Sequence, residues 1–168
     1  INIDLNFKNS FNVEKKHASR FILKSLNLAH HLALNNDVQG IINCPISKKL
    51  LIKEKIGVTE YLSKKCKIKD GSEVMLISNE KLSVCPITTH IDLKEVHKKI
   101  KSKLIIKKIS TINKWFTKRF NRKPKIGILG LNPHNAEFRK NSEEKRIILP
   151  AILKLKKNNI KLYGPLPS

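Results

Sequence analysis

Acidic and aromatic residues are scarce in this chain, and both shortages limit what it can do. Only 13 of the 168 residues are Asp or Glu, whereas 35 are Lys or Arg, which gives a formal net charge of +22. Aromatic residues make up 5% of the chain, and none alternates with basic residues as a base-stacking surface for nucleic acid requires. The lysines are dispersed and form no single stripe. Nucleic acid is therefore disfavoured as a partner. A basic nucleic-acid-binding module is kept as an alternative to an enzyme function. An anionic, phosphate-bearing substrate fits the charge better.

Cysteine is also scarce, and long apolar runs are absent. The three cysteines, Cys44, Cys66 and Cys85, are far apart and form no Cys-x-x-Cys pair, which excludes a zinc knuckle and a dithiol redox motif. Cys44 and Cys85 lie in strand-like runs and are predicted to be small core residues in a reducing cytoplasm. No apolar run is long enough to span a membrane, and no signal peptide is recognisable. A cytoplasmic protein with no membrane partner is the prediction.

Short apolar runs alternate with longer helical stripes along the chain. The runs predicted to be strands of one sheet are Val38–Cys44, Leu82–Thr88 and Lys125–Leu131. Two helices predicted to pack on this sheet span Glu14–Asn35 and Leu104–Phe120, because both carry apolar residues at three-and-four spacing. The alternation predicts a layered α/β fold. We expect one unit over residues 1–168, with no internal boundary.

An antiparallel hairpin is also predicted. Glu73–Ser78 and Lys81–Thr88 are strand-like runs joined by the turn Asn79-Glu80. Before the first helix the chain is polar and irregular, and Phe7 and Phe11 are its predicted anchors. The sheet of this fold is therefore expected to be mixed, with at least one antiparallel pair.

One stretch, Lys125–His134, organises the candidate site. It starts as a mostly apolar strand, and Asn132-Pro133 then ends that strand and places His134 at its carboxyl end. Ligands of open α/β sheets bind at this edge. Leu82–His90 repeats the arrangement. Because imidazole is the commonest protein ligand of divalent metals, both terminal histidines are candidate metal ligands, although catalytic sites generally use three protein ligands.

Several short motifs, taken in their order along the chain, are similar to those of a known protein family. They are Pro45–Lys48, Gly57–Glu60, Thr88–Ile91, Leu129–His134, Ser142–Glu144, Pro150–Ile152 and Gly164–Pro167. Together they resemble the 4-hydroxythreonine-4-phosphate dehydrogenase (PdxA) family of pyridoxal phosphate (vitamin B6) biosynthesis. The resemblance extends from the first helix onward and corresponds to the middle of the family's chain.

The resemblance implies a fold, an activity and a site. The implied fold is a three-layer α/β/α architecture like that of isocitrate and isopropylmalate dehydrogenases, incomplete here at both ends. The implied reaction is oxidation, with decarboxylation, of a phosphorylated hydroxy amino acid by NAD or NADP. A divalent metal (Zn, Mg or Co) is held by three histidines at a homodimer interface. His90 and His134 match two of them, and the third is expected beyond Ser168. Thr59 matches a substrate-binding residue, whereas no residue here is assigned to catalysis or to cofactor binding.

The chain departs from the family pattern at two places. The family usually has Gly-His-Thr-Glu where this chain has Gly57–Glu60, and Val58 cannot donate a hydrogen bond. The glycine-rich loop usual after Asn-Pro-His is replaced by Asn135–Asn141, which contains no Gly. A related dehydrogenase for another phosphorylated hydroxy acid is therefore an alternative. Because the chain starts at Ile1 and ends directly after a strand-like run, an inactive fragment is also an expectation.

Overall fold

The computed structural model describes residues 1–51, 57–68 and 71–167. These residues form two compact units, Ile1–Lys67 and Ile68–Ser168. The sequence led us to expect one unit, because no linker or change in composition marks a boundary near Lys67. Each unit has its own apolar core, so each is described by itself.

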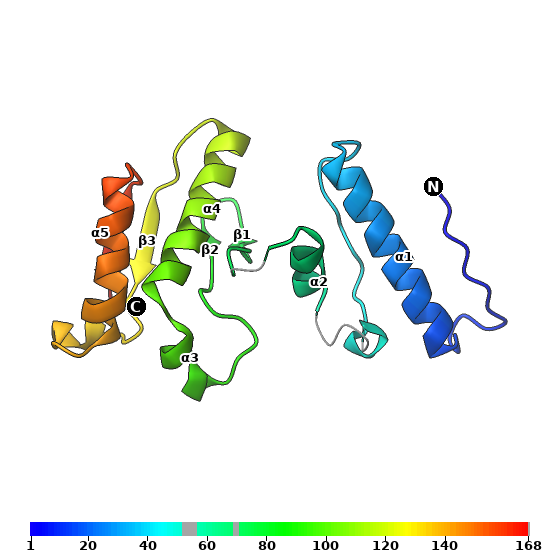
Figure 1. Cartoon of the computed structure of the whole chain (residues 1–168), viewed down its shortest axis with the longest axis horizontal. Coiled ribbons are helices and arrows are strands. Elements are labelled where there is room, and N and C mark those ends of the chain that lie inside the picture. The colour runs from blue at the N-terminus through cyan, green and yellow to red at the C-terminus, as the bar shows by residue number, and fades with distance from the viewer. Residues whose placement is uncertain (52–56, 69–70, 168) are drawn as a thin grey trace. The chain divides into compact units, whose positions relative to one another are not determined.

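The first unit is helical. It contains α1 (Lys15–Leu34), the 3₁₀ segment η1 (Lys48–Leu51) and α2 (Val58–Lys65) (Figure 1). Its buried core consists of Leu26, Leu51 and Tyr61. The predicted helix over Glu14–Asn35 is thus confirmed to within one residue at each end.

Two side-chain hydrogen bonds tie the elements of the first unit together. The Tyr61 hydroxyl donates to Asn27 Oδ1 at 2.9 Å, which joins α2 to α1. The Ser19 hydroxyl donates to the Leu50 carbonyl at 2.6 Å, which joins α1 to η1. Val58 is half-buried against this core, so it plays a packing role at the position where the family pattern has His.

Three predictions for the first unit are wrong. Val38–Cys44 is not a strand, and Ile42 is fully exposed. Cys44 is exposed and is not a core residue, and Phe7 and Phe11 are 52% and 99% exposed and anchor nothing. An apolar run becomes a strand only where a neighbouring strand pairs with it, and the described part of the first unit contains no strand.

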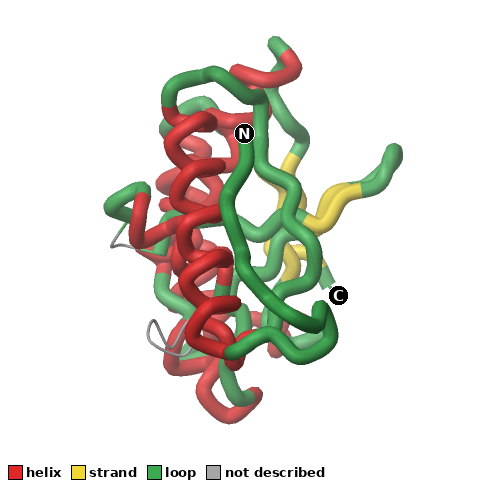
Figure 2. Tube along the Cα trace, turned by 90° about the vertical axis from the view of Figure 1, so that its right-hand side faces the viewer, coloured by secondary structure: helices red, strands yellow, loops and turns green. Residues whose placement is uncertain are grey.

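The second unit combines helices with two small sheets. Its helices are α3 (Leu93–Lys99), α4 (Ser102–Phe120), η2 (Asn135–Phe138), the π-helical turn η3 (Glu144–Ile148) and α5 (Leu149–Lys157). Its strands are β1 (Ile77–Ser78), β2 (Ser83–Val84), β3 (Ile126–Leu129) and β4 (Leu162–Leu166). The strands are short compared with the helices, as Figure 2 shows.

The core of the second unit lies between the β3–β4 sheet and the helices α4 and α5 (Figure 1). β3 pairs with β4 in parallel, with Ile126 opposite Leu162, and η3 and α5 form the connection between the two strands. The fully or nearly fully buried side chains are Ile105, Ile109, Ile128, Ile148, Ala151, Ile152, Leu155 and Leu162. The predicted strand around Lys125–Leu131 and the predicted helix around Leu104–Phe120 are both confirmed.

The predicted hairpin is also confirmed, although its strands are shorter than expected. β1 and β2 pair antiparallel, with Ile77 opposite Val84. The Asn79 side-chain oxygen accepts hydrogen bonds from the backbone N–H groups of Lys81 and Leu82 at 2.9 and 2.8 Å, which shapes the turn. The prediction that β2 and β3 belong to one sheet is wrong, because each pairs within a separate two-stranded sheet.

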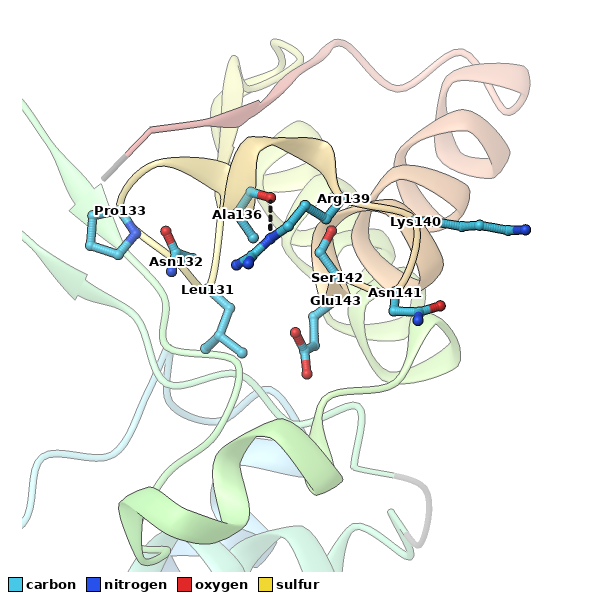
Figure 3. A pocket seen from close by; sticks show the side chains of 9 residues that line it. All are labelled: Leu131, Asn132, Pro133, Ala136, Arg139, Lys140, Asn141, Ser142 and Glu143. Carbon is cyan, nitrogen blue, oxygen red and sulfur yellow. Dashed lines mark hydrogen bonds between the residues drawn. The ribbon is translucent and has the colours of Figure 1, made fainter.

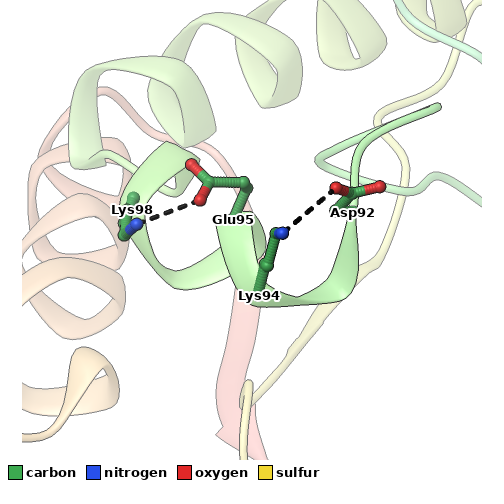
Figure 4. Close-up of polar contacts among 4 residues, drawn as sticks. All are labelled: Asp92, Lys94, Glu95 and Lys98. Atoms are coloured by element: carbon green, nitrogen blue, oxygen red, sulfur yellow. Dashed lines mark hydrogen bonds and ion pairs between the residues drawn. The ribbon is translucent and has the colours of Figure 1, made fainter.

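Helix α3 begins directly after Asp92. Asp92 is its N-cap residue, and the Lys94–Asp92 and Lys98–Glu95 ion pairs lie on its surface at 3.9 and 2.9 Å (Figure 4). Exposed pairs of this kind stabilise a helix only slightly. Within the described residues, no helix has the length and apolarity needed to cross a membrane.

Candidate functional site

The candidate site is the turn that follows β3. The Gly130 N–H donates to the Leu166 carbonyl at 2.9 Å and thereby extends the pairing of β3 with β4. A Cβ at Gly130 would overlap the Asn135 side-chain oxygen and would lie 3.0 Å from the Asn132 carbonyl. Only glycine therefore fits at the point where the strand becomes a turn.

Asn132 builds the turn itself. Its side-chain oxygen accepts a hydrogen bond from the His134 N–H at 2.9 Å, and its carbonyl accepts one from the Asn135 N–H at 2.8 Å. The Asn135 side-chain N–H in turn donates to the Pro165 carbonyl at 3.2 Å. The backbone of His134 is therefore fixed to β3 on one side and, through Asn135, to β4 on the other.

A buried carboxylate holds this turn in place. Glu144 at the start of η3 is fully buried, and its Oε1 accepts a hydrogen bond from the Asn132 N–H at 2.8 Å. Burial by itself raises the pKa of the Glu144 carboxyl. Hydrogen bonds from the backbone of Asn132, Glu144 and Leu131 and from the Ser142 side chain outweigh burial and lower that pKa below its usual value. Glu144 is therefore ionised and acts as an acceptor.

The segment after His134 has an unusual backbone. All four residues of η2 have positive φ: Asn135 53°, Ala136 46°, Glu137 51° and Phe138 52°. The left-handed region is unfavourable for residues that carry a Cβ. The turn thus keeps a conformation that suits glycine, although this chain has no Gly there.

Replacing Ala136 with Gly is expected to stabilise the second unit by about 1 kcal/mol, because glycine adopts positive φ without steric cost. Urea unfolding followed by the fluorescence of Trp115, the chain's single Trp, measures this change in unfolding free energy. The matched control is Ala151→Gly in the buried interior of α5, which should destabilise the unit. A destabilised Ala136→Gly variant would show that the left-handed turn is not formed in solution.

An open pocket of about 560 Å³ lies beside the turn. Its lining residues are Leu131, Asn132, Pro133, Ala136, Arg139, Lys140, Asn141, Ser142 and Glu143 (Figure 3). Arg139 is tethered in this pocket, because its Nε donates to the Ala136 carbonyl at 3.2 Å. The lining combines apolar residues with two cationic side chains, one carboxylate (Glu143) and neutral hydrogen-bonding groups.

The predicted site residues are distributed over both units. His134 is exposed in the turn after β3, and His90 is exposed in the loop between β2 and α3. Thr59 is exposed in the first turn of α2 in the first unit, and Gly57 is the N-cap of that helix. Because β2 and β3 belong to different sheets, the two histidines do not leave a common sheet edge. That both histidines bind a metal stays a prediction.

The described residues do not form a complete metal site. Across residues 1–51, 57–68 and 71–167, no three His, Cys, Asp or Glu side chains are grouped so that they could hold an ion. Two exposed imidazoles fit a divalent metal only as part of a larger ligand set. His90 and His134 can therefore contribute to such a site but do not complete it.

Sequence reasoning missed the groups that support the turn. In the sequence Glu144 stands out only as the last residue of the Ser142–Glu144 motif, and its burial has no local signal. Gly130 and Arg139 were not singled out. Gly130 could have been found, because a glycine just before an Asn-Pro turn indicates close backbone approach.

Comparison with known proteins decides the family. A sequence profile of the family described as "Pyridoxal phosphate biosynthetic protein PdxA" matches residues 1–168. The chain belongs to this family. The resemblance that the motifs carry is thereby confirmed.

Individual relatives agree with this assignment. The 4-hydroxythreonine-4-phosphate dehydrogenase of Aquifex aeolicus is 40% identical over 138 residues, which cover 80% of this chain and 42% of the relative. The crystal structure of the Klebsiella pneumoniae 4-hydroxythreonine-4-phosphate dehydrogenase matches with a TM-score of 0.81 and 28% identity, covering 90% of this chain and 46% of that one. The α/β class is confirmed by this match. The chain spans less than half the length of these PdxA proteins.

One relative carries a different name. A protein of Oceanobacillus iheyensis that is provisionally named D-threonate 4-phosphate dehydrogenase is 34% identical over 148 residues, which cover 85% of this chain and 44% of the relative. Proteins similar to this chain therefore carry names that specify different phosphorylated hydroxy acids.

Proposed function

We propose that the protein containing this chain is a metal- and NAD(P)-dependent dehydrogenase that oxidises and decarboxylates 4-phosphohydroxythreonine in pyridoxal phosphate biosynthesis. The observation that carries the proposal is the match of the PdxA profile to residues 1–168. The names of the relatives, which describe dehydrogenases of a phosphorylated substrate, support it. The open pocket beside the turn, whose lining includes Arg139, is compatible with such a substrate.

In this proposal His90 and His134 supply two ligands of a divalent metal. The backbone of His134 is held by Asn132, and both imidazoles are exposed, so they are available to an ion. The remaining ligand comes from outside this chain or from a second subunit. When bound, the metal (Zn, Mg or Co) would polarise the substrate hydroxyl as a Lewis acid, and NAD or NADP would accept the hydride.

Thr59 is proposed to bind the substrate through its hydroxyl group, which is exposed in the first turn of α2 and can both donate and accept a hydrogen bond. Val58 is half-buried in the core of the first unit and offers no polar group to a substrate. A second candidate is therefore a dehydrogenase for another phosphorylated hydroxy acid. The relative named for D-threonate 4-phosphate favours it.

The assembly and the complete fold belong to the same proposal. A homodimer would bring together ligands that a single chain lacks. A three-layer α/β/α fold would place further layers around the small β3–β4 sheet. A cytoplasmic location belongs to the same proposal.

The test is a spectrophotometric assay of the full-length protein with NAD or NADP, a divalent metal and two substrates. Reduction of the nicotinamide with 4-phosphohydroxythreonine, and much less with D-threonate 4-phosphate, is the expected result. The reverse preference would favour the second candidate. No reduction with either substrate would contradict the dehydrogenase proposal.

A further inference from the structure

We propose that Arg139 forms a binding site for a phosphate group in the pocket beside the β3 turn. The guanidinium lies in the pocket wall, and its Nε–H is already engaged by the Ala136 carbonyl at 3.2 Å. This hydrogen bond orients the exposed side chain and leaves the two terminal nitrogens available. A tethered guanidinium binds the oxygens of a phosphate by paired, charge-assisted hydrogen bonds.

The charges around Arg139 support an anionic ligand. Among the residues that the structure describes, no carboxylate lies within ion-pair distance of Arg139. Glu143 also lines the pocket, and Figure 3 shows no ion pair between it and Arg139. Within the described part of the chain, Arg139 therefore has no direct ion-pair partner.

Neutral polar groups complete the pocket. Asn132 and Ser142 line the same cavity, and the Arg139 side chain turns back toward Leu131 and Asn132 (Figure 3). Lys140 follows Arg139 directly, yet its side chain extends away from these residues. One of two adjacent cations thus faces the cavity, and the other serves as a matched control.

The source of the phosphate is either a phosphorylated substrate or a nicotinamide dinucleotide. The choice of these two sources rests on the proposed dehydrogenase function. Phosphate binding itself can be measured without metal, cofactor or turnover, so its failure is distinguishable from failure of the dehydrogenase proposal.

The experiment is an NMR titration of the 168-residue chain that follows the Arg139 Nε–H signal. Inorganic phosphate, O-phosphothreonine and NADP are the three probes, and acetate at equal ionic strength tests whether any anion suffices. We expect phosphate and O-phosphothreonine to shift the signal saturably and acetate to leave it nearly unchanged. A larger response to NADP than to O-phosphothreonine would assign the phosphate to the cofactor.

The variants are Arg139→Gln, Arg139→Lys and Lys140→Gln, each first checked for an unchanged circular dichroism spectrum. Isothermal titration should show phosphate affinity falling about tenfold in Arg139→Gln, partly recovering in Arg139→Lys, and changing less than about twofold in Lys140→Gln. Equal losses of phosphate affinity in Arg139→Gln and Lys140→Gln would show that general surface charge causes the effect, and would contradict a specific site at Arg139. An Arg139→Gln variant with unchanged affinity would overturn it as well.

Discussion

Replacing Glu144 with Gln is expected to destabilise the second unit by about 2 kcal/mol. The carboxylate is fully buried and accepts the Asn132 N–H at 2.8 Å. Its other oxygen, Oε2, is also buried and has no hydrogen-bond partner among the described residues, so an amide would place an N–H₂ donor group in a space that offers it no acceptor. A buried donor without an acceptor costs roughly 1–3 kcal/mol, which is large beside the total stability of a small domain.

This loss should depend on pH in a defined direction. Burial alone would raise the pKa of Glu144, but the hydrogen bonds from the backbone and from Ser142 lower it below the value of an unfolded chain. Its contribution to stability is therefore complete above the unfolded pKa, near about 4.3, and is lost as the pH falls through the folded pKa. The difference between wild type and Glu144→Gln should shrink at acidic pH.

Urea unfolding monitored by Trp115 fluorescence at neutral and at acidic pH measures both effects. The matched control is Glu143→Gln, one residue earlier, because that half-buried side chain lines the open pocket and makes no described contact with Asn132. Its unfolding free energy should change by less than about 0.5 kcal/mol. Equal effects of the two variants would contradict the role of Glu144 in holding the turn.

Replacing His134 with Ala is expected to lower the turnover of the full-length protein by at least about a hundredfold. Loss of an outer-shell partner alone costs metal affinity or activity by roughly 10–100-fold, and removal of a direct ligand should cost at least as much. The fold should be unaffected, because the imidazole is exposed and the turn is held through the backbone N–H of His134, which alanine retains.

The NAD(P)-reduction assay, together with a thermal melt, checks this prediction. His97→Ala is the control, because His97 is an exposed histidine on α3 to which no site role is assigned. It should keep its turnover. If His134→Ala turned over at the wild-type rate, the assignment of His134 as a metal ligand would have to be abandoned. Unchanged turnover with a lower melting temperature would point instead to a structural role.

The helices and the site turn could be predicted because their signals are local. Helix α1 and helix α4 carry apolar stripes at helical spacing, and the structure reproduces both. The apolar run before Asn132-Pro133 predicted β3 and the exposed position of His134 after it. Hydrophobic periodicity and turn chemistry act over a few residues, so the sequence alone determines them.

Strand pairing and the support of the turn could not be predicted, because they depend on residues distant in the sequence. Val38–Cys44 and β3 were both predicted to be strands, but β3 pairs with β4, whereas the described first unit offers no partner strand. Glu144 is buried only because η3 packs next to the turn and the Asn132 N–H needs an acceptor. The sequence by itself determined the helices, β3, the family and the exposed histidine after β3. Only the tertiary structure decided which strands pair and which carboxylate holds the turn, since hydrogen-bond partners are chosen by proximity in space.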